Sequence, residues 1–253
     1  MVSEEKEIGM HDENDLYLSI VIPAYNEEKR IGGTLGNIIN YLNKKDYKSE
    51  IIVVVDGSTD STMNVIKKFG RKNARIKTIE NKITRGKGYS VKKGMLETRG
   101  KFVLFTDADL STPISEFEKL IHWLEKGYDV AIGSRSLGDS QVEIRQPFVR
   151  ESMGKIFNKI MSLLVCTGFK DTQCGFKCFR RQVINKIFSK QIINGFAFDV
   201  EIILIAKIHG FRVKEVPVRW LNSPHSKVSI IRDPLVMFCD LLRIKFYDLM
   251  KKY

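Results

Sequence analysis

The chain has 253 residues, of which 43% are hydrophobic and 28% charged, a composition typical of a folded globular domain. Its 42 Lys and Arg residues outnumber 30 Asp and Glu residues, giving a formal net charge of +12. This charge favours an anionic partner such as a nucleotide, a phosphorylated lipid or a membrane surface. The sequence has no zinc-finger spacing and no basic run interleaved with aromatic residues, which argues against nucleic acid as a partner.

The beginning of the chain and its cysteines indicate a cytoplasmic protein. Residues 1–16 are mostly polar and rich in acidic side chains, so we expect a disordered tail and no signal peptide. No uninterrupted apolar stretch is long enough to span a bilayer. The four cysteines form no CxxC pair, which favours free thiols in a reducing compartment. We therefore expect a cytoplasmic protein, lying peripherally on the cytoplasmic face of a membrane if it contacts one.

Short apolar runs rich in β-branched residues alternate with segments of helical spacing. The predicted strands are 18–22 (ended by Pro23), 51–55, 76–79, 102–105 and 129–132. Helical segments are predicted at 31–42, 65–69, 87–100 and 114–125. Continuous apolar strands alternating with helices predict an α/β fold, a mostly parallel sheet flanked by helices on both faces.

Polar motifs follow three of these strands: PAYNEE from Pro23, DGSTDST from Asp56 and TDADLS from Thr106. Ligands of parallel α/β sheets bind beyond the carboxyl ends of the strands, so we expect these three motifs to form one site. The segment 85–88, RGKG, opens a helix and is suited to cradling a phosphate. A glycine-rich turn with solvated basic residues is the alternative interpretation.

Asp107 and Asp109 follow the central strand directly. Side chains two apart in extended chain point to the same face, and two carboxylates at close range repel unless a cation lies between them. Mg²⁺ prefers oxygen ligands and usually keeps positions open for substrate phosphates. The pair therefore predicts a metal–diphosphate site, with a solvated Asp turn as the alternative.

The second half of the chain contains two further amphipathic patterns. Residues 149–164 have helical spacing, typical either of a helix packed on the core or of one seated in lipid headgroups. The last helix is predicted to begin at Asp233, with Pro234 at its first position. Its apolar residues lie along one face, at Leu235, Phe238, Leu242, Phe246 and Leu249. We expect a domain over 17–230 and a C-terminal amphipathic helix over 231–253.

Between these patterns, residues 171–176 are expected to form a dense polar segment between helices. A helix is predicted over 198–209, with Asp199 as its N-cap and Gly210 beyond its end. Asp199 and Glu201, two apart on a helix, should face different ways and are not expected to act as a catalytic pair. A late strand is predicted at 213–218, and His225–Lys227 is expected to form a basic loop.

Taken together, these residues resemble family 2 glycosyltransferases of the GT-A fold, from Leu18 to about Lys227. Within that family they are most similar to the dolichyl-phosphate (polyprenyl-phosphate) β-glucosyltransferases, and next to the dolichyl-phosphate mannose synthases. The segments that carry the resemblance are SIVIPAYNEE, IIVVVDGSTDST, GKGYSVKKGM, TDADLSTP, GSR, DTQCGFKCF, FAFDVE and SKV.

The resemblance implies roles for individual residues. The donor nucleotide would be held by Pro23, Tyr25, Glu27 and Asp56, and approached by Lys87. Mg²⁺ or Mn²⁺ would be bound by Asp107 and Asp109. The acceptor phosphate and the sugar would lie near Arg135, Asp171 and Gln173. Mannose synthases of this type usually carry a Gln metal ligand where this chain has Ser111, which weakens the mannose interpretation.

The expected reaction is inverting, metal-dependent transfer of a hexose from a nucleoside diphosphate sugar, first of all glucose from UDP-glucose, to a polyprenyl or dolichyl phosphate. A phosphate acceptor needs no general base, because its second pKa is about 6. Asp171 is therefore expected to orient substrate first and to act as a base second. The alternatives are mannose transfer from GDP-mannose, a glycan or protein acceptor, a sugar nucleotidyltransferase, and a non-catalytic nucleotide-sugar or membrane-binding module.

Overall fold

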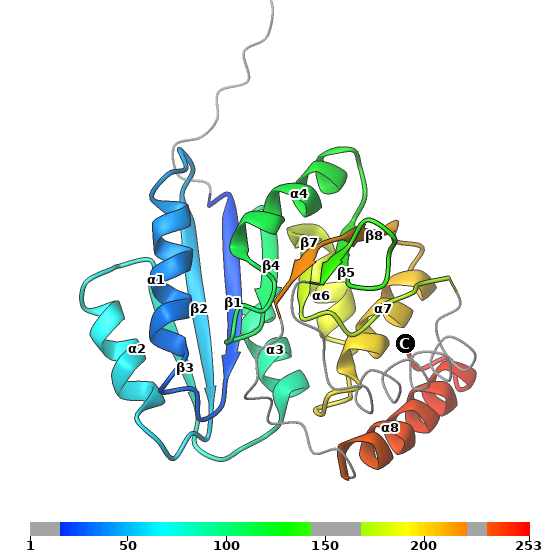
Figure 1. Ribbon diagram of the computed structural model, residues 1–253. Helices are drawn as coiled ribbons and strands as arrows, with labels where there is room; N and C mark the ends of the chain where they lie inside the picture. The colour runs from blue at the N-terminus through cyan, green and yellow to red at the C-terminus, as the bar shows by residue number, and fades with distance from the viewer. Residues whose placement is uncertain (1–15, 143–167, 222–231) are drawn as a thin grey trace, which may run out of the picture.

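The computed structural model describes residues 16–142, 168–221 and 232–253. A seven-stranded sheet with the order β3-β2-β1-β4-β7-β5-β8 runs through the molecule (Figure 1). Its strands are β1 (Leu18–Ala24), β2 (Ser49–Asp56), β3 (Ile76–Asn81), β4 (Phe102–Thr106), β5 (Val130–Ser134), β7 (Phe176–Arg180) and β8 (Val213–Pro217). The predicted mostly parallel α/β sheet is confirmed, since only β7 runs antiparallel to its two neighbours.

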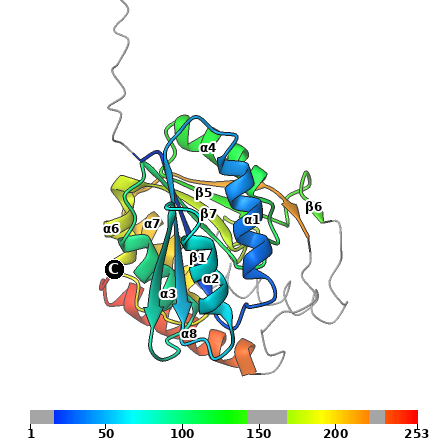
Figure 2. The same ribbon diagram turned by 90° about the vertical axis from the view of Figure 1, so that its left-hand side faces the viewer.

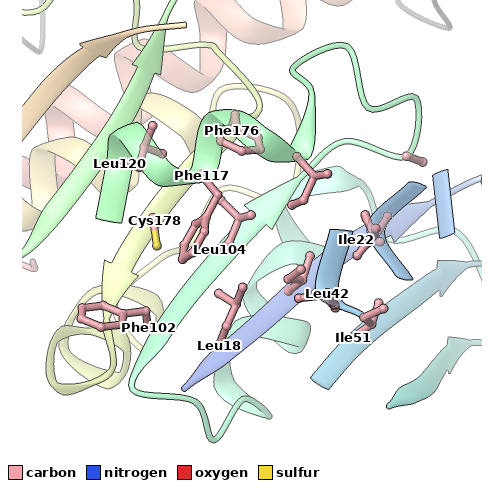
Figure 3. Packing of buried hydrophobic residues seen from close by; sticks show 14 of the residues in the cluster. Leu18, Ile22, Leu42, Ile51, Phe102, Leu104, Phe117, Leu120, Phe176 and Cys178 are labelled. Carbon is pink, nitrogen blue, oxygen red and sulfur yellow. The ribbon is translucent and has the colours of Figure 1, made fainter. Parts of the chain in front are cut away.

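Helices cover both faces of the sheet (Figure 2). They are α1 (Ile31–Leu42), α2 (Thr62–Gly70), α3 (Lys87–Leu96), α4 (Phe117–Glu125, after the 3-10 turn Ile114–Glu116), α6 (Arg181–Phe188), α7 (Phe198–Ile208) and α8 (Arg232–Leu249). Alternate strand residues serve two separate cores. Ile22 and Leu104 pack with α1 and α4 (Figure 3), whereas Val21 and Phe105 pack with α3, α6 and α7. Burial on both faces explains why these strands are continuous apolar runs.

Pro23 does not end the first strand as predicted, because β1 continues to Ala24. Pairing with β4 stops at Val21, whereas pairing with β2 extends through Ala24. At Pro23 the strand therefore has a partner on one side only, a position where a missing backbone N–H is tolerated.

The strand β7 and the helix α6 were not predicted, and Phe176 belongs to this strand rather than to a polar connection. β7 lies between β4 and β5 and is antiparallel to both. Its sequence, FKCFR, has a lysine at its centre, and Lys177 is fully buried. A buried charge is retained only with a partner, and the partner, Asp199, comes from α7.

The predicted N-cap role of Asp199 is wrong, because its side chain pairs with the buried Lys177 instead. Ala197 occupies the N-cap position of α7, and the Asp199 side chain is buried against Lys177. The prediction that Asp199 and Glu201 face different ways is confirmed, since Glu201 accepts hydrogen bonds from the backbone of Ile192 and Ile193.

The C-terminal helix α8 begins one residue before the predicted Asp233. It packs on the second core through Met237, Leu241 and Ile244. The apolar stripe predicted along this helix faces outward and is exposed. None of the helices that the structure describes is both long enough and apolar enough to cross a membrane.

Some predictions concern residues outside the described ranges. They are the N-terminal tail up to residue 15, the amphipathic segment 149–164 and the basic loop His225–Lys227. A small second sheet lies at the edges of two of these gaps, where β6 (Gln141–Val142) pairs in parallel with β9 (Arg219–Trp220).

Candidate active site

The loops that follow β1 and β2 are joined by hydrogen bonds. Asn26 donates its backbone N–H to Ser58 Oγ at 3.0 Å, and its side-chain Oδ1 accepts the backbone N–H of Thr59 at 2.8 Å. Glu27 donates its backbone N–H to Thr62 Oγ1 at 2.6 Å. The first two strand-end motifs therefore lie together, as predicted.

Asp56, at the end of β2, fixes the loop that leads into α3. Its Oδ1 accepts hydrogen bonds from Asn81 Nδ2 and the Arg85 backbone, both at 2.9 Å, and its Oδ2 accepts the Gly86 backbone N–H at 2.8 Å. Gly86 has φ of +107°, and a Cβ there would lie 2.4 Å from the Asn194 carbonyl oxygen. Only glycine suits this turn, which sets the position of the following residue, Lys87.

The carboxylates of Asp107 and Asp109 each face a cation from another element. Asp107 Oδ1 lies 2.6 Å from Lys87 Nζ, at the start of α3. Asp109 Oδ2 lies 3.7 Å from an Arg30 nitrogen, and its Oδ1 accepts the Ser111 backbone N–H at 3.0 Å. Burial, and then the charge of Asp107, raise the pKa of Asp109. The pair is therefore a concentrated negative charge held by two basic residues.

Arg30 in turn is held by Glu27, whose carboxylate accepts two hydrogen bonds from the guanidinium at 2.6 Å. Glu27, predicted to contact the nucleotide, thus also positions a cation beside the acidic pair. Tyr25 is 42% exposed beside this loop. A hollow of about 500 Å³ opens next to Asp109, lined by Arg30, Thr34, Asn37, Ser111, Arg219 and others.

The acidic pair fits a hard divalent cation. Two carboxylates supply the oxygen ligands that Mg²⁺ and Mn²⁺ prefer, and Mg²⁺ sites of this kind take one or two carboxylates and leave other positions to phosphates and water. Within the described ranges, no third His, Cys, Asp or Glu joins them in a metal-binding group. The donor set therefore matches a metal shared with a substrate diphosphate.

Gly175 provides the space for the Asp107 carboxylate. The Asp107 backbone N–H donates to the Gly175 carbonyl at 3.2 Å, and a Cβ on Gly175 would lie 2.0 Å from Asp107 Oδ2. Any side chain at this position must displace the carboxylate. This contact explains why the DTQCGF segment has a glycine at position 175, for which the sequence offered no reason.

We expect Gly175→Ala to reduce transfer about 100-fold, because misplacing a catalytic group by about 1 Å costs that much. The loss should be accompanied by weaker Mn²⁺ binding in a calorimetric titration. Gly138→Ala is a matched control, since a Cβ at Gly138 meets nothing within 4 Å. Full activity of the Gly175 variant would contradict the assigned role of this contact.

The fully buried Asp171 forms an ion pair with Arg135, whose side chain is 28% exposed, and its carboxylate has no position left for another donor. Asp171 Oδ2 accepts hydrogen bonds from the Arg135 backbone at 2.9 Å and from Nε at 2.7 Å. Its Oδ1 accepts from an Arg135 terminal nitrogen at 2.9 Å and from the Gln173 backbone at 3.2 Å. A carboxylate has about four acceptor positions, so all are used.

The electrostatics of this pair follow from its burial. Burial acts to raise the pKa of Asp171, but the charge and hydrogen bonds of Arg135 outweigh it and the pKa is lowered. Burial likewise acts to lower the pKa of Arg135, and Asp171 reverses the effect. The Arg135 guanidinium also lies over the Trp220 ring, with Cζ 5.5 Å from its centroid. Both groups therefore stay charged at neutral pH.

Three residues of this region were missed by sequence reasoning. Arg30 pairs with Asp109, and Lys177 pairs with Asp199. Glu215 accepts a hydrogen bond from the backbone N–H of Asp171. Lys177 gave one usable signal, a lysine inside the apolar run FKCF. Arg30 and Glu215 gave none, because the groups that they hold, Asp109 and the Asp171 backbone, lie far away in the sequence.

Solved structures with the same arrangement of elements are GT-A glycosyltransferases. A mannosyl-3-phosphoglycerate synthase from Rubrobacter xylanophilus matches with a TM-score of 0.68 at 19% identity, over 94% of this chain and 75% of that chain. A glucosyl-3-phosphoglycerate synthase from Mycobacterium tuberculosis, solved with Mn²⁺, UDP-glucose and phosphoglyceric acid, matches with a TM-score of 0.66 at 16% identity, over 91% of this chain and 80% of that chain. The fold is therefore GT-A.

Sequence similarity then gives the family. Residues 19–188 match glycosyl transferase family 2. A dolichyl-phosphate beta-glucosyltransferase of Dictyostelium discoideum is 37% identical, over 92% of this chain and 75% of the relative. Those of Saccharomyces cerevisiae and Homo sapiens are 35% and 33% identical, over 96% and 90% of this chain and 78% and 74% of the relatives. The chain belongs to glycosyltransferase family 2.

Proposed function

We propose that this glycosyltransferase moves glucose from UDP-glucose to a dolichyl or other polyprenyl phosphate, with Mg²⁺ or Mn²⁺, at the cytoplasmic face of a membrane. The relatives named dolichyl-phosphate beta-glucosyltransferase support the sugar and the acceptor. The observation that carries the acceptor class is the state of Asp171, whose carboxylate is fully engaged.

A hydroxyl acceptor needs a general base within hydrogen-bond reach of its proton. Asp171 accepts four hydrogen bonds and has a lowered pKa, so it is poorly suited to removing a proton. Asp56 and Glu27 are similarly bound by the loop backbone and by Arg30. A phosphate monoester is already anionic near neutral pH, so it is the acceptor that best suits this site.

The proposed division of work follows the geometry. Asp107 and Asp109 would hold the metal, which supplies charge neutralisation to the diphosphate leaving group. Lys87 and Arg30, next to these carboxylates, would hold the donor phosphates. Arg135, oriented by Asp171 and backed by Trp220, would hold the acceptor phosphate. Tyr25 and the remaining acceptor position on Asp56 Oδ2 would contact the nucleotide base, near Pro23, while Gln173 would lie towards the sugar.

The exposed face of α8 supports membrane contact. Leu235, Phe238, Leu242, Phe246 and Leu249 are 42–70% exposed on this face. A contiguous apolar face of this kind marks an interaction surface. Arg243 and Lys245 on the same helix have side chains 62% and 43% exposed, which favours anionic headgroups.

Vesicles test this surface. We expect wild-type protein to bind phosphatidylserine-containing vesicles less tightly as salt rises, and Leu242→Glu with Phe246→Glu to reduce binding at least ten-fold. The control is Ile83→Glu with Ile208→Glu, which places the same charges on apolar residues 64% and 44% exposed elsewhere. Unchanged binding of the α8 variant would contradict membrane docking by this face.

A donor panel tests the sugar. The protein is incubated with a short polyprenyl phosphate, Mn²⁺ and labelled UDP-glucose, UDP-galactose, UDP-N-acetylglucosamine or GDP-mannose. We expect lipid-phase label from UDP-glucose, lost when EDTA is added. Label from GDP-mannose alone would overturn the proposed sugar and retain the acceptor, whereas donor hydrolysis without lipid label would overturn the acceptor.

A further inference from the structure

Lys87 pairs with Asp107, one of the two carboxylates proposed to hold the metal ion. Its Nζ lies 2.6 Å from Asp107 Oδ1, which is buried. The other oxygen, Oδ2, lies against the Gly175 backbone, where a Cβ would be only 2.0 Å away. A cation bound to Asp107 would therefore share this carboxylate with the ammonium group, and the two positive charges would repel each other.

We propose that Lys87 is the counter-ion of Asp107 in the metal-free enzyme, and that a divalent cation displaces its ammonium group, which then binds the donor diphosphate. This inference rests on the metal site of the proposed function. It assigns to Lys87 two successive partners, first a carboxylate of the protein and then a phosphate of the substrate.

The surroundings of Lys87 allow its ammonium group to leave Asp107 without losing all stabilisation. The group lies 5.8 Å and 6.0 Å from the ring centroids of Phe105 and Phe198, distances at which an aromatic face attracts a cation. Asp199 also attracts it. Asp199 itself is bound to Lys177, so it keeps a partner wherever Lys87 moves.

Two consequences follow for binding. In the absence of nucleotide, Mn²⁺ must compete with Lys87, so removal of the ammonium group should tighten Mn²⁺ binding even though it lowers transfer. In the presence of UDP, the released ammonium group gains a phosphate partner. Mn²⁺ should therefore strengthen the binding of UDP, and UDP should strengthen the binding of Mn²⁺ by the same factor. Removal of Lys87 should reduce this coupling.

Calorimetric titration of the full chain with MnCl₂, with and without UDP, tests the inference. We expect Lys87→Met to bind Mn²⁺ about ten-fold more tightly than wild type without UDP, and to gain less affinity when UDP is added. Lys87→Arg keeps the charge and should stay close to wild type. Lys72→Met, an exposed lysine between α2 and β3, is the control for net charge.

The outcomes separate this inference from the proposed function. Suppose that the wild type binds Mn²⁺ and that Lys87→Met, with an unchanged thermal midpoint, binds it equally or more weakly. This result would overturn the proposed displacement of Lys87 but would support the metal site. If the Met variant has a lowered midpoint, Lys87→Gln provides the same comparison. Absence of Mn²⁺ binding to wild type, with or without UDP, would overturn both.

Discussion

Asp109→Asn is expected to lower transfer at least 1,000-fold while leaving the fold intact. A metal that neutralises a leaving diphosphate contributes several kcal/mol to the transition state, and about 1.4 kcal/mol corresponds to a factor of ten in rate. The amide loses the charge that holds the metal. It keeps an oxygen able to accept the Ser111 backbone N–H, which Asp109 accepts at 3.0 Å.

The stability of the Asp109→Asn variant should not fall. Burial and the neighbouring Asp107 raise the pKa of Asp109, so its ionised form destabilises the metal-free fold at neutral pH. We expect a thermal midpoint equal to or above that of wild type. Asp46→Asn, an exposed change in the connection between α1 and β2, is the control. Substantial activity of the Asp109 variant with Mn²⁺ would refute its assignment as a metal ligand.

Arg135→Met is expected to lower the free energy of unfolding by about 3–5 kcal/mol, the usual cost of removing one partner of a buried ion pair. Asp171 is fully buried and accepts three of its four hydrogen bonds from Arg135, one of them from the backbone. Without the guanidinium the carboxylate stays buried with backbone donors alone. Denaturant unfolding followed by circular dichroism measures the loss.

The pH dependence distinguishes this explanation from a loss of packing. In wild type the pKa of Asp171 is lowered, so its contribution to stability is full above its unfolded pKa and is lost as the pH falls through the folded pKa. In the variant, burial without Arg135 should raise the pKa of Asp171, so protonation of this carboxyl as the pH falls should increase the free energy of unfolding. The stability difference between the two proteins should therefore shrink between about pH 6 and pH 3; a constant difference would contradict the ion-pair account.

The parallel strands of the sheet could be predicted because each is recognisable from its own short stretch of sequence. β1, β2 and β4 are buried on both faces, so each is a continuous apolar run bounded by polar residues. Alternation with helices then gives the sheet type. The carboxyl-end rule further predicted that the loops after these strands meet, as the bonds between Asn26, Ser58 and Thr59 confirm.

β7 could not be predicted because its stability depends on a distant residue. A lysine in the middle of a five-residue segment normally indicates an exposed position. Lys177 is buried only because Asp199, which follows much later in the chain, supplies the opposite charge. The sequence carries both residues but no local pattern that joins them.

The site residues illustrate the same limit. The resemblance to a family selects Asp171, Arg135, Asp56 and Glu27 as members of the site, but not their partners. The structure adds that Asp171 binds Arg135, that Glu27 holds Arg30 and that Asp56 fixes the turn at Gly86. These contacts favour the orienting role that was expected first for Asp171 over its second role as a base.

The helix α8 shows why periodicity alone does not assign a buried face. The stripe through Leu242 and Phe246 was predicted correctly as apolar, and a second stripe through Met237, Leu241 and Ile244 packs on the core. The helix is thus apolar on two sides. Only the structure decides which side the protein covers and which it leaves exposed.

The most direct test of the central claim compares two acceptors that differ only in the terminal phosphate group. The protein is given labelled UDP-glucose, Mn²⁺ and either a short polyprenyl phosphate or the corresponding free polyprenol. If no carboxylate of the described residues is free to act as a base, the phosphate should be glucosylated and the alcohol should not, with a rate that falls as the acceptor phosphate is protonated below about pH 6. Glucosylation of the free alcohol at a comparable rate would contradict the account.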